Sequence, residues 1–157
     1  MTDLLVKLYT LPPLEPEISY QRSQGITIRR AIAPEKHLIL AWVQDNFNSY
    51  WVSECDVAFH NLPVSCWTAI EDGQIIGFAC YECTYKNFFG PMGVLEIAQG
   101  GGVGQTLLLA SLHDMWVQGY AYAIVGGVGP VDFYRKVVET MEITDSTPGI
   151  YGGMLRK

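Results

Sequence analysis

The chain carries little charge and has no segment where positive charge gathers. Only 17% of its 157 residues are Asp, Glu, Lys or Arg, and the formal net charge is −6. Lys and Arg occur singly apart from Arg29-Arg30, Arg135-Lys136 and the final Arg156-Lys157, so the basic patch with which proteins bind nucleic acid is missing. The sequence also contains no apolar run of about 18 residues, the length that a membrane-spanning helix needs. We therefore expect neither nucleic acid nor a membrane as a partner.

The amino terminus lacks the basic region of a secretory signal, because Asp3 stands there and the apolar stretch that follows is short. We therefore expect a cytoplasmic protein. Hydrophobic residues make up 49% of the chain, which argues against disorder. The length suits one domain that buries roughly 70% of its unfolded surface. Residues 1–157 are thus predicted to form a single domain, with residues 1–24 as an N-terminal extension that begins with a candidate edge strand.

Cysteine is scarce, with four residues in the chain. Cys80 and Cys83 have the Cys-x-x-Cys spacing of redox or metal sites, but they lie in a run of strand character, where residues three apart point to opposite faces. No second close pair of Cys or His completes a zinc site, although His60 lies near Cys55 and Cys66 in the sequence. We therefore expect free, buried thiols and no metal site.

Glycine, by contrast, is abundant, and it is concentrated in residues 93–109. Gly100 to Gly102 are adjacent and Gly104 follows, so another molecule can approach the backbone closely. The pattern predicts a short strand, a turn and the start of a helix. No charged residue lies between Glu96 and Asp114, so no carboxylate offsets the positive end of that helix. Such a turn suits an external anion, usually phosphate; a plain turn with glycines for tight packing is the alternative.

The spacing of these glycines excludes two common phosphate-binding loops. A dinucleotide fingerprint needs a third glycine three residues after Gly104, where Leu107 stands. A Walker loop needs Gly-Lys-Ser/Thr, and no Lys occurs between Lys86 and Lys136. The loop must therefore belong to another type.

Gln99, Gly102 and Gly104 fill the pattern Gln/Arg-x-x-Gly-x-Gly/Ala. This pattern resembles the pyrophosphate loop of the GNAT acetyltransferase superfamily, and Val94 stands where that family's strand meets the pantetheine arm of its cofactor. Farther along the chain, Phe133-Tyr134-Arg135-Lys136 is similar to the family's Phe-Tyr-Glu-Lys segment. Two such segments in the right order strengthen the resemblance beyond what either carries alone.

The order of predicted elements between about Ile26 and Leu155 also resembles the GNAT fold. It runs strand, helix, an irregular helical stretch, three strands, glycine loop, helix, strand, short helix and final strands. Pro34 opens the first helix, Asp72-Gly73 forms a hairpin turn, and Gly119 ends the helix after the glycine loop. We therefore predict an α/β (α+β) domain with a mixed, mostly antiparallel twisted sheet and helices on both faces.

The resemblance implies an enzyme that transfers the acetyl group of acetyl-CoA, its cosubstrate, to an amine by direct attack in a ternary complex. Tyr134 matches the family's general acid, and a phenol of pKa about 10 is a sensible proton donor to a thiolate. A core tyrosine that anchors the short helix is the alternative. The residues implied in binding acetyl-CoA are Val94, Gln99, Gly100, Gly101, Gly102, Val103, Gly104 and Gln105.

The general base is not fixed by the sequence. Glu82, in a strand predicted from Gln74 to Lys86, and Glu96 flank the expected cleft, and Glu54 is a third candidate. A carboxylate that acts through a water molecule would suffice. We therefore name Glu82 and Glu96 beside Tyr134 as candidate catalytic residues.

Three departures from the family pattern leave a second function open. Glycines fill the loop where the family often has Arg or Lys, Gly127 stands in place of an Asn, and Glu96 stands in place of a Pro. These changes remove charge assistance to the pyrophosphate but keep the backbone groups. The alternative function is a non-catalytic module that binds acyl-CoA or a nucleotide on the same fold.

The acceptor is expected to be a small amine that is cationic in solution. This expectation rests on the net charge of −6 together with acidic residues and aromatic residues in segments that border the expected cleft. Ordinary solvated surface carboxylates are the alternative explanation. A homodimer is left open. The acidic residues are Glu54, Asp56, Glu82 and Glu96, and the aromatic residues are Trp51, Tyr81 and Phe88.

Overall fold

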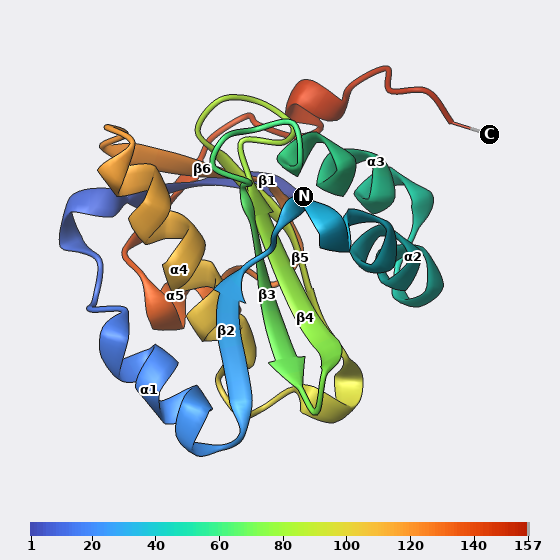
Figure 1. Cartoon of the computed structure of the whole chain (residues 1–157). Coiled ribbons are helices and arrows are strands. Elements are labelled where there is room, and N and C mark those ends of the chain that lie inside the picture. Colours follow the sequence, from blue (N-terminus) through green and yellow to red (C-terminus); the bar gives the residue numbers. More distant parts are fainter. Residues whose placement is uncertain (157) are drawn as a thin grey trace.

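A computed structural model describes residues 1–156, which form a seven-stranded sheet with helices on both faces (Figure 1). The strands lie in the order β2-β3-β4-β5-β6-β1-β7, and neighbours are antiparallel except for the parallel pair β5 and β6. The predicted mixed, mostly antiparallel sheet is confirmed. The strands are β1 (Thr2–Lys7), β2 (Ile26–Arg30), β3 (Cys66–Glu71), β4 (Gln74–Tyr81), β5 (Phe88–Val94), β6 (Tyr122–Val128) and β7 (Thr140–Ile143).

Five α-helices cover the sheet in the part of the chain described. They are α1 (Glu15–Ser23), α2 (Lys36–Asn46), α3 (Ser49–Ala58), α4 (Val103–Val117) and α5 (Val131–Val137). Helices α1 and α4 lie on one face, and α2 and α3 lie on the other (Figure 1). Within residues 1–156, no helix combines the length and the apolarity needed to cross a bilayer.

Helix α4 is the centre of the larger core. Its residues Leu107, Leu108, Leu109, Leu112 and Met115 have no exposed surface, so the helix is apolar nearly all round, as buried helices are. Gly119, two residues after the last residue of α4, adopts a left-handed conformation (φ 103°) that ends the helix, as the sequence predicted.

The hairpin between β3 and β4 forms where it was predicted. Asp72 (φ 51°) and Gly73 (φ 73°) are both left-handed, which is the geometry of a tight hairpin turn. Farther along β4, a Cβ added at Gly77 would lie 3.1 Å from the Leu107 side chain and 3.3 Å from that of Val94. The sheet therefore approaches α4 closely at the level of the glycine loop.

The N-terminal strand is not an edge strand, contrary to our expectation. Strand β1 lies inside the sheet and pairs antiparallel with both β6 and β7. Leu4 and Val6 are fully buried, and the unbroken apolar run Leu4-Leu5-Val6 suits a strand with neighbours on both sides. Pro12 and Pro13 come after the strand has ended at Lys7 and do not affect its pairing. Helix α1, which begins at Glu15, was not predicted.

The C-terminal segment does not form the strand expected between Tyr151 and Leu155. This segment contains Gly152 and Gly153, and glycine is depleted in strands. It instead makes a single 3-10 turn at Gly149–Tyr151 and crosses toward α3, where the Tyr50 hydroxyl donates a hydrogen bond to the Leu155 carbonyl oxygen (3.3 Å; Figure 1). The segment thereby covers one end of the sheet.

Candidate active site

The two parallel strands at the centre of the sheet separate after two residue pairs. Phe88 pairs with Ile124 and Phe89 with Val125, and no further pairing between β5 and β6 is present in residues 1–156. On its other side, β5 carries one extra residue between Phe89 and Met92 relative to β4, which is a bulge. A bulge bends its strand. Strand β5 therefore diverges from β6 and leaves a fork between them.

The inner edge of the fork carries backbone groups without a strand partner. The Leu95 N–H donates to the Ile76 carbonyl oxygen of β4 (2.9 Å). Because backbone groups alternate along a strand, the N–H of the preceding Val94 points to the opposite edge, toward the fork. A ligand with amide groups can bind here as if it were an added strand.

The glycine turn leads from β5 into α4 and leaves its amides free. Gly102 is the N-cap residue in a left-handed conformation (φ 87°), and the first turn of α4 holds no acidic residue in the described chain. The first hydrogen bond into the helix runs from Thr106 N to Gly102 O (3.0 Å), so the N–H groups of Val103, Gly104 and Gln105 have no acceptor inside the helix. Val103 itself is buried and offers only this backbone group. The turn is thus built to receive an anion.

Helix α1 anchors the glycine turn through Gln21, a residue that the sequence reading missed. Gln21 is 1% exposed, and its Nε2 donates to the Gly101 carbonyl oxygen (2.7 Å). Gln99 ties the other end of the turn to β5, because its Nε2 donates to the Val94 carbonyl oxygen (3.2 Å). Gln21 lies in a weakly amphipathic segment, so the pattern of apolar residues did not indicate that this side chain is buried.

The fold brings together the two segments that resemble the family. A Cβ added at Gly104 would lie 3.5 Å from the Phe133 ring and 3.7 Å from the Val94 side chain. The start of α4, the end of β5 and helix α5 are therefore in contact. This contact places Tyr134, the residue after Phe133, beside the fork.

Tyr134 packs against two aromatic rings and lines a cavity beside the fork. The residue is 7% exposed, and its ring makes edge contacts with Phe89 (6.3 Å between centroids) and Phe133 (5.1 Å). Burial raises the pKa of Tyr134 to about 12. The hydroxyl has no hydrogen-bond partner among residues 1–156, yet it is not sealed from solvent. It is therefore a protonated donor that is free to serve a ligand.

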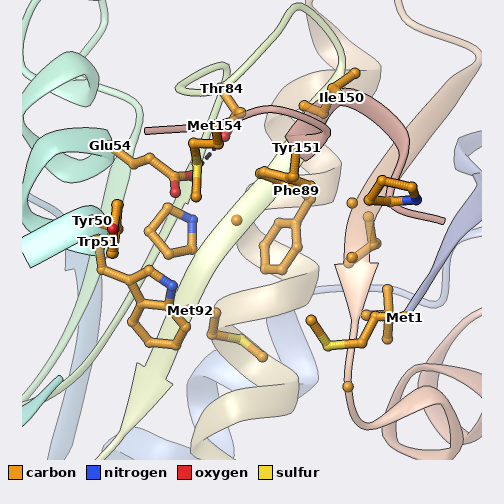
Figure 2. A pocket seen from close by; sticks show the side chains of 18 of the residues that line it. Met1, Tyr50, Trp51, Glu54, Thr84, Phe89, Met92, Ile150, Tyr151 and Met154 are labelled. Atoms are coloured by element: carbon orange, nitrogen blue, oxygen red, sulfur yellow. Dashed lines mark hydrogen bonds between the residues drawn. The ribbon is translucent and has the colours of Figure 1, made fainter. Parts of the chain in front are cut away.

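A cavity of about 850 Å³ adjoins the fork. It lies between α3, β5, β6 and the C-terminal segment, and Gly90 and Gly126 line both the cavity and the fork (Figure 2). Its lining is mostly apolar and aromatic, as small-molecule sites are. The side chains that form most of this lining are Tyr50, Trp51, Phe89, Met92, Tyr151 and Met154.

Glu54 is the one carboxylate that lines this cavity in the described chain. It lies on α3 and accepts a hydrogen bond from Thr84 Oγ1 (2.6 Å; Figure 2). Burial raises the pKa of Glu54 above the usual range of a carboxyl group. Burial also raises the pKa of Tyr151, with a further contribution from the negative charge of Glu54. Glu54 and Tyr151 are therefore electrostatically linked across the cavity.

The structure brings neither Glu82 nor Glu96 to this cavity. Strand β4 ends at Tyr81, not at Lys86, because Glu82 adopts a left-handed conformation (φ 59°) that turns the chain. The Glu82 carboxylate then holds the turn, accepting hydrogen bonds from the backbone N–H of Asn87 and from the Tyr120 hydroxyl (3.1 Å). Glu96 lies exposed in a 3-10 turn after β5. Glu82 therefore follows the end of β4 instead of lying within the strand, as the predicted bounds required.

Of the four acidic residues predicted to border the cleft, Glu54 alone lines the cavity. Asp56 points from α3 to Lys36 (2.6 Å), where a surface ion pair forms. Tyr81 is fully buried, and its hydroxyl donates to Asp114 (2.9 Å). Of the aromatic residues expected there, Trp51 lines the cavity, whereas Phe88 packs against Gly126 of β6.

Known structures share this architecture at low sequence identity. The glucosamine N-acetyltransferase region of a fungal multi-domain β-N-acetylglucosaminidase superposes with a TM-score of 0.71 at 17% identity, over 90% of this chain and 20% of that one. A GCN5-related N-acetyltransferase from Sphaerobacter thermophilus gives 0.69 at 18% identity, over 90% and 48%. The GNAT family N-acetyltransferase YhbS of Escherichia coli, solved in complex with CoA, gives 0.52 at 22%, over 71% and 67%.

The chain spans about a fifth of the first of these structures and about half of the second, so the likeness concerns a part of each. No curated protein matches the chain. The Acetyltransferase (GNAT) family matches residues 30–137, a range that runs from the last residue of β2 to the end of α5 and holds every element of the site except α1 and the C-terminal segment. The chain therefore belongs to the GNAT acetyltransferase family.

Proposed function

We propose that the protein transfers the acetyl group of acetyl-CoA to an amine by direct attack in a ternary complex. The observation that carries the proposal is the convergence of three features: the glycine turn with free amides, the fork between β5 and β6, and the Tyr134 hydroxyl at its end. Family membership supports acetyl transfer in general. Amine-dependent release of the CoA thiol tests the proposal.

The residues present fit acetyl-CoA, which supplies an acetyl group activated as a thioester. The amides of Val103 to Gln105 would hold the pyrophosphate at the start of α4. The free edge of β5 at Val94 would pair with the amides of the pantetheine arm. Gly100 and Gly101 leave open space, since a Cβ at either position would have no heavy atom within 4 Å. Backbone groups therefore perform the binding that Arg or Lys assists in relatives of this family.

Two side chains supply the proton transfers. The Tyr134 hydroxyl stays protonated at neutral pH because burial raises its pKa to about 12, so it can donate to the departing thiolate. Glu54 lies on the acceptor side of the fork and can accept a proton from an attacking amine, directly or through water. The buried position of Glu54 makes it a stronger base than an exposed carboxylate once it is ionised.

The cavity favours a small amine that is cationic in solution. Glu54 provides one negative charge, and the rings of Tyr50, Trp51 and Tyr151 provide faces for a cation–π contact worth roughly 0.5–2 kcal/mol. Arg156 also borders the cavity, from the C-terminal segment. An alkylamine has a pKa near 10.4 in water, so it must lose a proton before it attacks. The same carboxylate that attracts the ammonium group can thus accept this proton.

Replacement of Glu54 by Gln is expected to lower kcat/KM roughly 100-fold, because general bases contribute about 10²–10⁴. The parent rate should fall as pH drops through the raised pKa of Glu54, since only the ionised carboxylate accepts a proton. The Glu54→Gln enzyme should lack this acidic limb. Steady-state kinetics between pH 5 and about 9 measure both effects.

Glu71→Gln is the matched control, because Glu71 is an exposed carboxylate at the hairpin end of β3. It should retain the parent rate and pH profile. An unchanged acidic limb in Glu54→Gln would remove Glu54 from the role of base and leave the rest of the proposal standing.

The second candidate function is a non-catalytic module that binds acyl-CoA or a nucleotide. The observation that favours it is the absence of Lys and Arg from residues 97–113, which leaves the pyrophosphate without a charged partner in the loop. The free Tyr134 hydroxyl favours the enzyme, because a module that only binds has no need of a proton donor at the end of the fork.

A further inference from the structure

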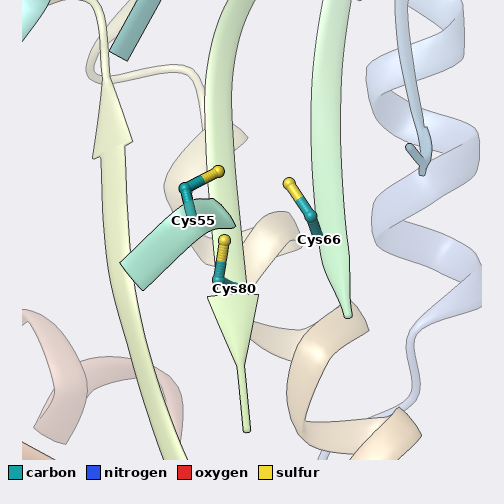
Figure 3. A group of neighbouring side chains, drawn as sticks. All are labelled: Cys55, Cys66 and Cys80. Carbon is teal, nitrogen blue, oxygen red and sulfur yellow. The ribbon is translucent and has the colours of Figure 1, made fainter. Parts of the chain in front are cut away.

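Three cysteines from separate elements meet behind the acceptor cavity. Cys55 lies on α3, Cys66 on β3 and Cys80 on β4, and all three are fully buried. Their Sγ atoms all lie within 4.8 Å of one another. In Figure 3 the three sulfur atoms point toward a common centre between the helix and the two strands. Sequence spacing missed this cluster, because it is created by the pairing of Cys66 with Cys80 and by the helix that packs over them.

The dimensions of the cluster suit a metal ion. The centre of an equilateral triangle with sides of 4.8 Å lies about 2.8 Å from each corner, whereas a thiolate binds a metal at about 2.3 Å. Each sulfur atom therefore needs to move by about 0.5 Å or less, which lies within the freedom of a cysteine rotamer. No backbone rearrangement is required.

The chemistry of the cluster selects a soft ion. The donor set consists of sulfur alone, with no carboxylate or imidazole among the described residues that form it. Its surroundings are apolar, with Ile39, Val43 and Phe78 in the same core. Soft thiolate ligands favour Cu(I), zinc and iron–sulfur clusters over hard cations.

The number of donors separates these ions. Structural zinc is almost always bound by four ligands. The fourth cysteine, Cys83, is buried nearby but lies outside the triangle, and its Sγ donates to the Tyr81 carbonyl oxygen (3.3 Å). The cluster therefore offers three sulfur donors, one fewer ligand than structural zinc usually takes.

We propose that Cys55, Cys66 and Cys80 bind one Cu(I) ion in a three-coordinate site. Binding links α3 to β3 and β4, and it releases protons from the thiols that are still protonated. Cys55 directly follows Glu54 and lies one turn after Trp51, so the ion fixes the helix that forms one wall of the cavity. The site does not depend on the proposed acetyl transfer.

The test is an anaerobic titration of the reduced full chain with Cu(I) in competition with the chelator bicinchoninate, with Zn(II) titrated in parallel. We expect one Cu(I) per chain, bound more tightly than Zn(II). Cys66→Ala and Cys80→Ala should each weaken Cu(I) binding by about 100-fold or more, because the loss of a direct ligand should exceed the roughly 10–100-fold cost of losing a supporting contact. Cys83→Ala is the matched control, a buried thiol outside the triangle whose loss should weaken binding less than the loss of either ligand does.

The proposal is overturned if no stoichiometric Cu(I) is bound, or if Cys83→Ala weakens binding as much as Cys80→Ala does. One equivalent of Zn(II) bound more tightly than Cu(I) would also overturn it, because it would indicate a four-sulfur site. If an alanine variant fails to fold, copper-edge X-ray absorption of the parent decides instead. Three sulfur neighbours at about 2.3 Å support the site, and nitrogen or oxygen neighbours contradict it.

Discussion

Replacement of Tyr134 by Phe is expected to lower kcat by roughly 100-fold or more and to leave the Kd for acetyl-CoA unchanged. The hydroxyl has no hydrogen-bond partner in the described chain, so its removal breaks no contact that holds the fold. The ring contacts with Phe89 and Phe133 remain in the variant. The lost interaction is one that forms only as negative charge develops on the thioester sulfur, so turnover falls and ground-state binding does not.

Single-turnover kinetics and calorimetry separate these two quantities. Tyr122→Phe is the matched control, because it removes an exposed hydroxyl whose partner is Tyr9 (3.5 Å), away from the cavity. With a pKa of about 12, Tyr134 should remain a proton donor up to about pH 11. The parent rate should therefore show no decrease from ionisation of this hydroxyl below that pH. A Tyr134→Phe enzyme within about threefold of the parent rate would show that another group protonates the thiolate.

Replacement of Gly102 by Val is expected to weaken acetyl-CoA binding at least about tenfold, or 1.4 kcal/mol. Gly102 has φ 87°, a conformation that a branched side chain rarely adopts, and an added Cβ would lie 3.2 Å from Gln21 Nε2. The variant therefore disturbs both the turn and the Gln21 contact that holds it. Isothermal calorimetry measures the loss, and thermal unfolding measures the strain, which costs about 1–3 kcal/mol.

Gly119→Val separates strain from binding. Gly119 has a similar left-handed conformation (φ 103°) at the opposite end of α4, with no heavy atom within 4 Å of an added Cβ. It should lower the midpoint of thermal unfolding as Gly102→Val does, yet bind acetyl-CoA normally. Equal affinity in the Gly102→Val protein and the parent would mean that the pyrophosphate lies elsewhere.

Sequence patterns were sufficient for the elements that local chemistry decides. The Asp72-Gly73 turn, the glycine turn before α4 and the end of α4 at Gly119 all depend on which residues tolerate left-handed backbone, and all three form as predicted. The mixed sheet could therefore be predicted from the order of these elements.

Contacts between distant segments could not be predicted. Strand β1 lies between β6 and β7 because of pairings with residues 115 or more positions away, and its own sequence does not specify these partners. The Gln21 contact with Gly101 joins residues 80 positions apart. The same limit applies to the three cysteines, which no sequence spacing brings together.

The choice of Glu82 as a candidate base depended on where β4 was predicted to end. A single left-handed residue at Glu82 ends β4 five residues before the predicted end and redirects that carboxylate into the turn. Glu54, by contrast, lies on a helix whose start is fixed by Asn48, whose side chain accepts a hydrogen bond from Trp51 N (2.9 Å). The regular helix carries Trp51 and Glu54 into the cavity together.

Release of the CoA thiol from acetyl-CoA, measured over a panel of polyamines, amino-acid amides, neutral amines and anionic amines, tests the central claim most directly. We predict release that requires an amine and yields the acetylated amine in equal amount. Cationic acceptors should react fastest, and their rates should fall as salt rises, because salt screens attraction to Glu54. A preference for anionic acceptors would contradict the cationic-amine assignment. Tight acetyl-CoA binding without release over any amine would contradict acetyl transfer itself and establish a binding module.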